Sequence, residues 1–125
     1  KLVDLPGYGY AKASKAMKRD WGVKITDYMK SRDSLKGVIL IMDIRHPFQE
    51  ADYNFLEWCH SFNLPIQLLL NKADKLSRNK SINILRDSAK ELSNFSLLDE
   101  PQIFSAKTFD GVDELVGKIK AWIES

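Results

Sequence analysis

The sequence predicts an α/β fold in which a mostly parallel sheet is flanked by helices. Two observations lead to this prediction: four short apolar segments that end at polar residues, and segments of helical periodicity that separate them. Apolar runs without alternation are typical of strands buried on both faces of a parallel sheet. Repeated strand–helix alternation favours right-handed crossovers between neighbouring strands.

The predicted strands are short and end where polar or glycine-containing segments begin. They are Leu2-Val3, Val38 to Met42, Ile66 to Leu70 and Ile103-Phe104. The longest of these runs is far shorter than the ~18 residues that a membrane-spanning helix needs. We therefore expect no membrane association.

Each predicted helix is marked by apolar residues at three- and four-residue steps. The first carries Met17, Trp21, Ile25 and Tyr28. The predicted helices cover residues 17–28, 51–62, 82–92 and 112–123. No linker or internal repeat interrupts this order, so the sequence predicts a single domain.

The composition is that of a soluble globular domain. The chain has 125 residues, of which 44% are hydrophobic and 29% are charged, and this excludes a disordered or collagen-like chain. The net charge of +2 is too small to indicate a nucleic-acid-binding protein. Cys59 is the only cysteine, so no intrachain disulfide forms, and a reducing, cytoplasmic location is favoured. We expect Cys59 to pack as a small core hydrophobe.

The first candidate binding motif is Asp4-Leu5-Pro6-Gly7, which follows the first predicted strand. Ligands of open α/β sheets bind outside the carboxyl ends of the strands. A carboxylate at Asp4 can hold a Mg²⁺-bound water, and Gly7 lets a backbone N–H approach a phosphate. By itself the motif is weak, because Pro-Gly is also ordinary turn chemistry.

The second motif is Asn71-Lys72-Ala73-Asp74, directly after the third predicted strand. A fixed carboxylate at Asp74 can accept hydrogen bonds from the N1–H and the 2-amino group of guanine. Adenine offers no such pair of donors, so the site would reject it. Lys72 can lay its aliphatic stem on the base, and Asn71 can tie neighbouring loops together. The alternative is a helix-capping Asn or Asp in a polar loop.

The third motif is Ser105-Ala106-Lys107, preceded by Phe104 at the end of the last predicted strand. The backbone N–H of Ala106 could donate to the guanine O6 atom, and Lys107 could cover the other face of the ring. The motif alone carries little information. Because all three motifs follow strands, with a helix between successive strands, together they favour a nucleotide-binding site.

These motifs resemble the G3, G4 and G5 motifs of P-loop GTPases, in that order. The wider strings Gly7-Tyr8-Gly9-Tyr10-Ala11-Lys12 and Asp43-Ile44-Arg45-His46-Pro47 are similar to the EngB (YihA/YsxC-type) family of bacterial GTPases. The resemblance implies binding of GTP and GDP with Mg²⁺, GTP hydrolysis, and a cytoplasmic monomer. It further implies roles in large ribosomal subunit assembly and in cell division and septation.

The same resemblance assigns the nucleotide contacts. Asp4 would also contact Mg²⁺ through a water. The assigned residues are Asp4, Leu5, Pro6, Gly7, Asn71, Lys72, Ala73, Asp74, Phe104, Ser105, Ala106 and Lys107. Tyr8 stands where many GTPases have a water-orienting Gln, so no catalytic residue is assigned and we expect slow intrinsic hydrolysis.

The sequence contains no G-x-x-x-x-G-K-[ST] motif, which cradles the phosphates in P-loop proteins. Residues 1–125 are therefore interpreted as the C-terminal part of a single GTPase domain without its P-loop portion. The main Mg²⁺ ligands are expected upstream of Lys1. We expect these residues alone to bind GTP very weakly and to fold poorly.

The segment from Lys12 to Lys36 has eight basic and three acidic residues, a net charge of +5. This concentration of charge suits contact with a phosphate backbone, which favours the ribosome or ribosomal RNA as a partner. The candidate contacts are Lys12, Lys15, Lys18 and Arg19. A solvated helix face is the alternative interpretation.

Two other functions remain open at this point. The chain could be a nucleotide-incompetent fragment that acts only as an RNA- or protein-binding module. It could also belong to another translational GTPase that shares the three motifs by general ancestry. No Cys, His or carboxylate spacing indicates a metal site built from this chain's own side chains.

Overall fold

A parallel three-stranded sheet organises the chain in the computed structural model, which describes residues 19, 22–24, 26–27, 35–95 and 100–124. The strands are β1 (Val38–Asp43), β2 (Ile66–Asn71) and β3 (Gln102–Ile103), in the order β1-β2-β3. Three predicted strands are thus confirmed to within a residue or two. The predicted strand at Leu2-Val3 lies outside the described residues.

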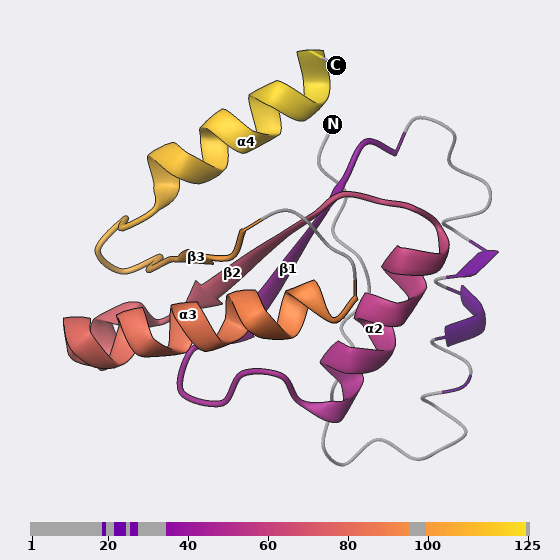
Figure 1. Cartoon of the computed structure of the whole chain (residues 1–125). Coiled ribbons are helices and arrows are strands. Elements are labelled where there is room, and N and C mark those ends of the chain that lie inside the picture. Colours follow the sequence, from indigo (N-terminus) through magenta and orange to yellow (C-terminus); the bar gives the residue numbers. More distant parts are fainter. Residues whose placement is uncertain (1–18, 20–21, 25, 28–34, 96–99, 125) are drawn as a thin grey trace.

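Helices follow the strands and lie on both sides of the sheet. They are α2 (Glu50–Ser61), η1 (Ala73–Lys75, a single 3₁₀ turn), α3 (Arg78–Ser93) and α4 (Val112–Glu124). Figure 1 shows α2 and α3 on one side of the sheet and α4 on the other. Ser77 caps α3 by accepting a hydrogen bond from the Lys80 N–H at 3.2 Å. Three predicted helices are confirmed; most of the one predicted for residues 17–28 is outside the described residues.

The hydrophobic core lies between the sheet and the helices α2 and α3. Residues 66–70 of β2 are all buried, as expected for a central strand covered on both faces. Phe55, Leu56 and Cys59 of α2 and Leu92 of α3 belong to the same core cluster. Burial raises the pKa of the Cys59 thiol to about 12, so Cys59 packs as a hydrophobic residue, as predicted.

The sequence also predicts that both faces of β1 are buried, and this is wrong for one face. Val38, Leu40 and Met42 are buried, whereas Ile41 on the opposite face is 59% exposed. Helix α4 has no buried residue, and its Val116 and Ile123 are exposed. The reason is that α4 does not close over this face of β1.

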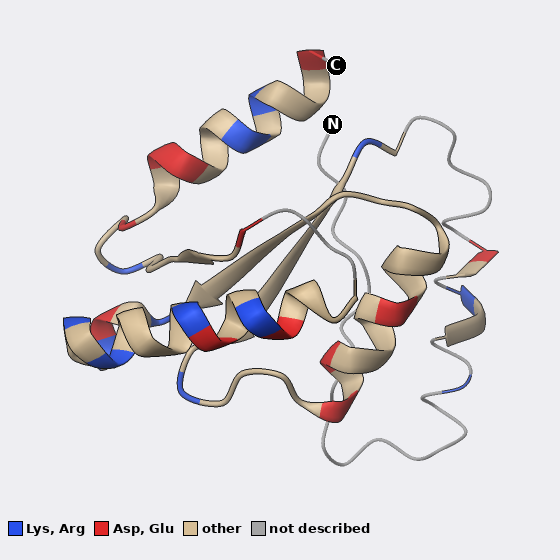
Figure 2. Ribbon diagram, viewed as in Figure 1, with Lys and Arg blue, Asp and Glu red and all other residues tan. Residues whose placement is uncertain are grey.

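Charges of both signs are mixed along the outer surface of α3, as Figure 2 shows. Its basic residues include Lys80 and Arg86, and Asp87 and Glu91 lie among them. Such mixing is typical of a solvated helix face. In the described ranges, no helix has both the length and the apolar character needed to cross a membrane.

The strand register brings the carboxyl ends of the three strands to one edge. Asp43 is paired in register with Asn71, and Leu70 is paired with Ile103. Because all three strands run in the same direction, the loops that follow them emerge side by side. This edge is where the sequence motifs after β2 and β3 meet.

A glycine shapes the loop between β3 and α4. Gly111 has a φ of +86°, and an added Cβ would collide with the carbonyl oxygen of Ile103. The Gly111 carbonyl also accepts a 2.8 Å hydrogen bond from the Gln102 side chain. The backbone of this loop therefore depends on the absence of a side chain at Gly111.

We predict that Gly111→Ala lowers the free energy of unfolding by more than about 1 kcal/mol, because alanine is strained at this φ and lacks space. Gly117→Ala is the matched control: apart from the backbone of its own helix and its chain neighbours, nothing lies within 4 Å of the added Cβ, and Gly117 is inside α4. It should raise the free energy of unfolding by about 0.5–1 kcal/mol. Chemical denaturation of both variants tests this, and equal effects would contradict it.

Candidate guanine-binding site

The loops after β2 and β3 are joined by backbone hydrogen bonds. The Ala73 N–H donates to the Phe104 carbonyl at 3.2 Å, and the Phe104 N–H donates to the Leu70 carbonyl at 2.9 Å. These bonds extend the β2–β3 pairing past the strand ends. The second and third sequence motifs are therefore neighbours in space.

Asp74 and Ser105 form the central side-chain contact between the two motifs. The Ser105 hydroxyl donates to Asp74 Oδ1 at 2.8 Å, and Ser105 is 1% exposed. The Asp74 side chain is 14% exposed, and the Lys75 ammonium lies 3.9 Å from Asp74 Oδ2. The Ser105 hydrogen bond lowers the pKa of Asp74; burial opposes it, and the charges of Lys75 and Lys107 add to it. Asp74 is thus an oriented, ionised carboxylate at neutral pH.

The third motif is held in place by its own loop. Ser105 Oγ accepts a 3.1 Å hydrogen bond from the Thr108 N–H, and the Ser105 N–H donates to the Asp110 carbonyl at 3.0 Å. Ala106 and Lys107 are exposed at the turn between these contacts. The loop therefore presents the Ala106 backbone and the Lys107 side chain to solvent beside Asp74.

Lys72 links β2 to η1 in an unusual backbone conformation. Its φ is +64°, in the left-handed region that non-glycine residues seldom adopt. Residues held in this region are frequent at ligand-binding loops. This conformation could not be predicted from the residue type, because lysine has no preference for it.

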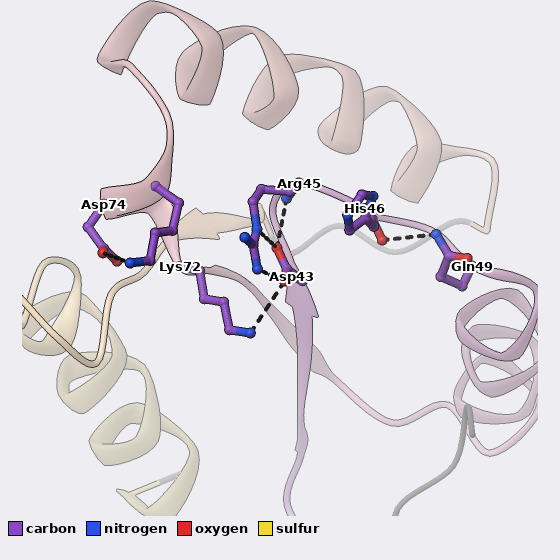
Figure 3. A network of polar contacts seen from close by, with 7 residues as sticks. Asp43, Arg45, His46, Gln49, Lys72 and Asp74 are labelled. Carbon is purple, nitrogen blue, oxygen red and sulfur yellow. Dashed lines mark hydrogen bonds and ion pairs between the residues drawn. The ribbon is translucent and has the colours of Figure 1, made fainter. Parts of the chain in front are cut away.

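A second cluster of charges surrounds Asp43 at the end of β1 (Figure 3). Arg45 donates to Asp43 through its backbone N–H at 2.9 Å, through Nε at 3.1 Å and through Nη2 at 2.8 Å. Lys72 Nζ lies 3.4 Å from Asp43 Oδ2. The side-chain hydrogen bond from Arg45 holds the pKa of Asp43 well below its usual range; burial opposes the shift, and Lys72 contributes to it.

The Asn71 backbone joins two neighbouring loops. The Ile44 N–H donates to the Asn71 carbonyl at 2.9 Å, which joins the loops after β1 and β2. Asn71 Oδ1 is buried and has no hydrogen-bond partner in the described part of the chain. A buried acceptor without a donor is unfavourable, and a donor from a ligand or another segment would satisfy it.

Several predicted site residues lie outside the described residues. These are Asp4, Leu5, Pro6, Gly7, Tyr8, Lys12, Lys15 and Lys18. Arg19 is described and exposed, and it lines a concavity of about 740 Å³ together with Asn54 and Trp58 of α2. The structure therefore places Arg19 beside α2 and not among the loops after β2 and β3.

The described ranges hold no group of three or more His, Cys, Asp and Glu side chains that could bind a metal ion. His46 contributes its carbonyl, which accepts a 3.1 Å hydrogen bond from the Gln49 side chain. The arrangement offers groups that can hydrogen-bond to a ligand: the Asp74 carboxylate, the exposed turn at Ala106 and the exposed lysines Lys72 and Lys107.

Comparison with known proteins gives matches along the whole chain. A "Probable GTP-binding protein EngB" from Mannheimia succiniciproducens is 42% identical over 128 residues, which cover 100% of this chain and 61% of that protein. A protein of the same name from Acinetobacter baylyi is 45% identical and covers 92% of this chain and 48% of its own length. This chain thus spans about half to three-fifths of these relatives. No model of a protein family matches the sequence.

Solved structures share the fold at lower identity. A crystal structure of a probable GTP-binding protein engB has a TM-score of 0.70 and 20% identity, and covers 97% of this chain and 76% of that one. Translation elongation factor SelB from Methanococcus maripaludis, in its apo form, has a TM-score of 0.75 and 19% identity, and covers 98% of this chain and 25% of SelB. These similarities establish the fold.

The lowered pKa of Asp43 predicts how stability changes with acid. Because the pKa is lower in the folded state than in the unfolded chain, ionised Asp43 stabilises the fold above about pH 4, and this contribution is lost as the pH falls below it. In the full-length protein, the free energy of unfolding should fall more steeply between about pH 5 and about pH 3 than in Asp43→Asn. Denaturation at several pH values measures how the free energy of unfolding depends on pH in the wild type and in Asp43→Asn. An equal dependence in both proteins would contradict the lowered pKa of Asp43.

Proposed function

This chain is a homologue of the EngB GTP-binding proteins, and we propose that it binds guanine nucleotides through the loops after β2 and β3. The observation that carries the proposal is the orientation of the Asp74 carboxylate. The Ser105 hydroxyl donates a 2.8 Å hydrogen bond to Asp74 Oδ1, and the turn at Ala106, next to Ser105 in the chain, is exposed. Two features support a purine site: an oriented carboxylate acceptor at Asp74, and an exposed turn at Ala106 whose backbone N–H is assigned as a donor.

The chemistry of guanine matches this arrangement. The N1–H and the 2-amino group of guanine both donate, and a carboxylate accepts from both at once. Adenine has an unprotonated N1 and no 2-amino group, so it would leave Asp74 with no donor pair and a desolvated charge. The Ala106 N–H is assigned to the O6 atom, and Lys72 and Lys107 are assigned to the two faces of the ring.

The proposed contacts extend to the remaining residues of the three motifs. Asn71 is assigned to the loop around the base, where its buried Oδ1 offers an acceptor. Ala73 and Phe104 hold the two base loops together through their backbone hydrogen bond. Asp4 and Gly7, with Leu5 and Pro6 between them, are assigned to the phosphate end, where Asp4 would hold a water on Mg²⁺.

For the whole protein we propose GTP hydrolysis, with residues 1–125 as part of a single GTPase domain. Bound Mg²⁺ would neutralise charge on the phosphates. Tyr8 takes the position at which a glutamine orients water in many GTPases, so we expect slow hydrolysis without a partner. The names of the relatives state GTP binding, and the chain covers only part of their length.

Asp74→Asn tests the guanine assignment directly. An amide cannot accept both guanine donors without presenting its own N–H₂ group to one of them, so the affinity of the full-length protein for GDP should fall at least about ten-fold. The preference for GDP over inosine diphosphate, which lacks the 2-amino group, should shrink as well. Isothermal titration calorimetry with both nucleotides measures these changes.

Asp87→Asn is the matched control, because this substitution removes the same negative charge at an exposed position on α3. It should bind both nucleotides as the wild type does. If Asp74→Asn keeps the wild-type affinity and the wild-type preference, Asp74 does not contact the base.

A ribosomal partner is proposed from the charge distribution. The segment from Lys12 to Lys36 has a net charge of +5, whereas α3 mixes both signs along its length (Figure 2). Clustered positive charge binds a phosphate backbone and releases counterions. We assign this segment, with Lys12, Lys15, Lys18 and Arg19, to ribosomal RNA, and the cellular role to large-subunit assembly with an effect on division and septation.

This partner assignment predicts salt-dependent binding to ribosomal RNA. The logarithm of the binding constant should fall linearly with the logarithm of the salt concentration, and charge reversal at Lys15, Lys18 and Arg19 should reduce both the affinity and the slope. Reversal at Lys80, Arg86 and Lys90 of α3 is the control and should change little. Binding that is independent of salt, or that survives the first set of reversals, would contradict the assignment.

A further inference from the structure

The end of β1 lies beside the lysine that follows β2, because the two strands are parallel and in register. Asp43 pairs with Asn71, the last residue of β2, and Lys72 follows directly. The Lys72 ammonium reaches back across the edge of the sheet, and its Nζ lies 3.4 Å from Asp43 Oδ2. Figure 3 shows this contact joining the loops that follow the two strands.

Arg45 fixes the carboxylate that receives this ammonium. Its backbone N–H and Nε bind Asp43 Oδ1, and its Nη2 binds Oδ2 at 2.8 Å. An acceptor with donors on both oxygens has little freedom to rotate. The Asp43 side chain is 25% exposed, whereas Lys72 is 52% exposed, so the fixed carboxylate anchors the more exposed and flexible partner.

The backbone of Lys72 adds to this restraint. A φ of +64° directs the chain sharply from β2 into η1, and the side chain leaves this turn toward Asp43. Asp74 is two residues farther along the same turn, with its carboxylate bound to Ser105. The two acidic residues therefore hold separate parts of one loop: Asp43 holds the lysine end, and Asp74 is directed to Ser105.

We propose that Asp43 is a positioning residue for Lys72, which holds the lysine stem where it can cover one face of a bound guanine. This inference rests on the proposed guanine site. A lysine side chain loses rotamer freedom when a base binds against it. Because the ion pair with Asp43 already restricts the Lys72 side chain, less freedom is lost on binding. Asp43 thereby raises affinity for the nucleotide, and Asp74 decides which base is bound.

A double-mutant cycle in the full-length protein tests the inference. The variants are Asp43→Asn, Lys72→Met and the two combined, and the dissociation constant for GDP is measured by calorimetry. We expect about a two- to five-fold weakening for Asp43→Asn, the size typical of an exposed ion pair. The combined variant should bind no more weakly than Lys72→Met alone, because both changes remove the same contact.

Two controls separate positioning from a general loss of structure. Asp43→Asn combined with Lys80→Met, a change on the exposed surface of α3, should show only the effect of Asp43→Asn. The ratio of GDP to inosine diphosphate affinity should stay at the wild-type value in Asp43→Asn, since a distorted loop would also displace Asp74. Asp43→Ser serves as a second variant, because its hydroxyl can still accept the Arg45 N–H.

The outcomes distinguish this inference from the proposed function. If the fold-changes in the GDP dissociation constant for Asp43→Asn and Lys72→Met multiply in the combined variant, and the preference for guanine is intact, the positioning role is overturned and the guanine site stays in place. A changed preference in both Asp43 variants would also overturn it, in favour of a structural role. A wild-type protein that does not bind GDP would overturn both proposals.

Discussion

The hydrogen bond from Ser105 to Asp74 is the contact on which the candidate site depends. It joins residues 31 positions apart in the chain, and it turns a loop carboxylate into an oriented acceptor. The backbone bonds at Ala73 and Phe104 bring the two loops within reach of each other. Without this contact, the motif after β2 would be a polar turn that could equally cap a helix.

Two carboxylates at neighbouring strand ends have different environments and, in our account, different roles. Asp43 is bound by Arg45 and lies near Lys72, so its charge is largely neutralised by cations. Asp74 is bound chiefly by a neutral hydroxyl, so its negative charge is available to a ligand that donates hydrogen bonds. This division follows from which side chains the parallel sheet places beside each strand end.

The sequence predicted the strands and helices well because their apolar residues follow simple periods, as in β2 and α3. It also predicted that the motifs after β2 and β3 meet, since parallel strands end at a common edge. It could not predict the contact of Asp43 with Lys72, which depends on the exact register between two strands. The exposure of Ile41 was missed for a related reason: the pattern of β1 does not reveal whether α4 covers it.

The most direct measurement is a crystal structure of the full-length protein with GDP bound. We predict that both Asp74 carboxylate oxygens lie within about 3 Å of the N1 and 2-amino nitrogens of guanine, which is ordinary hydrogen-bond distance. The Ala106 N–H should point at O6, and Lys72 should still lie beside Asp43. A guanine bound elsewhere, with Asp74 contacting only Ser105 and solvent, would show that Asp74 does not select the base.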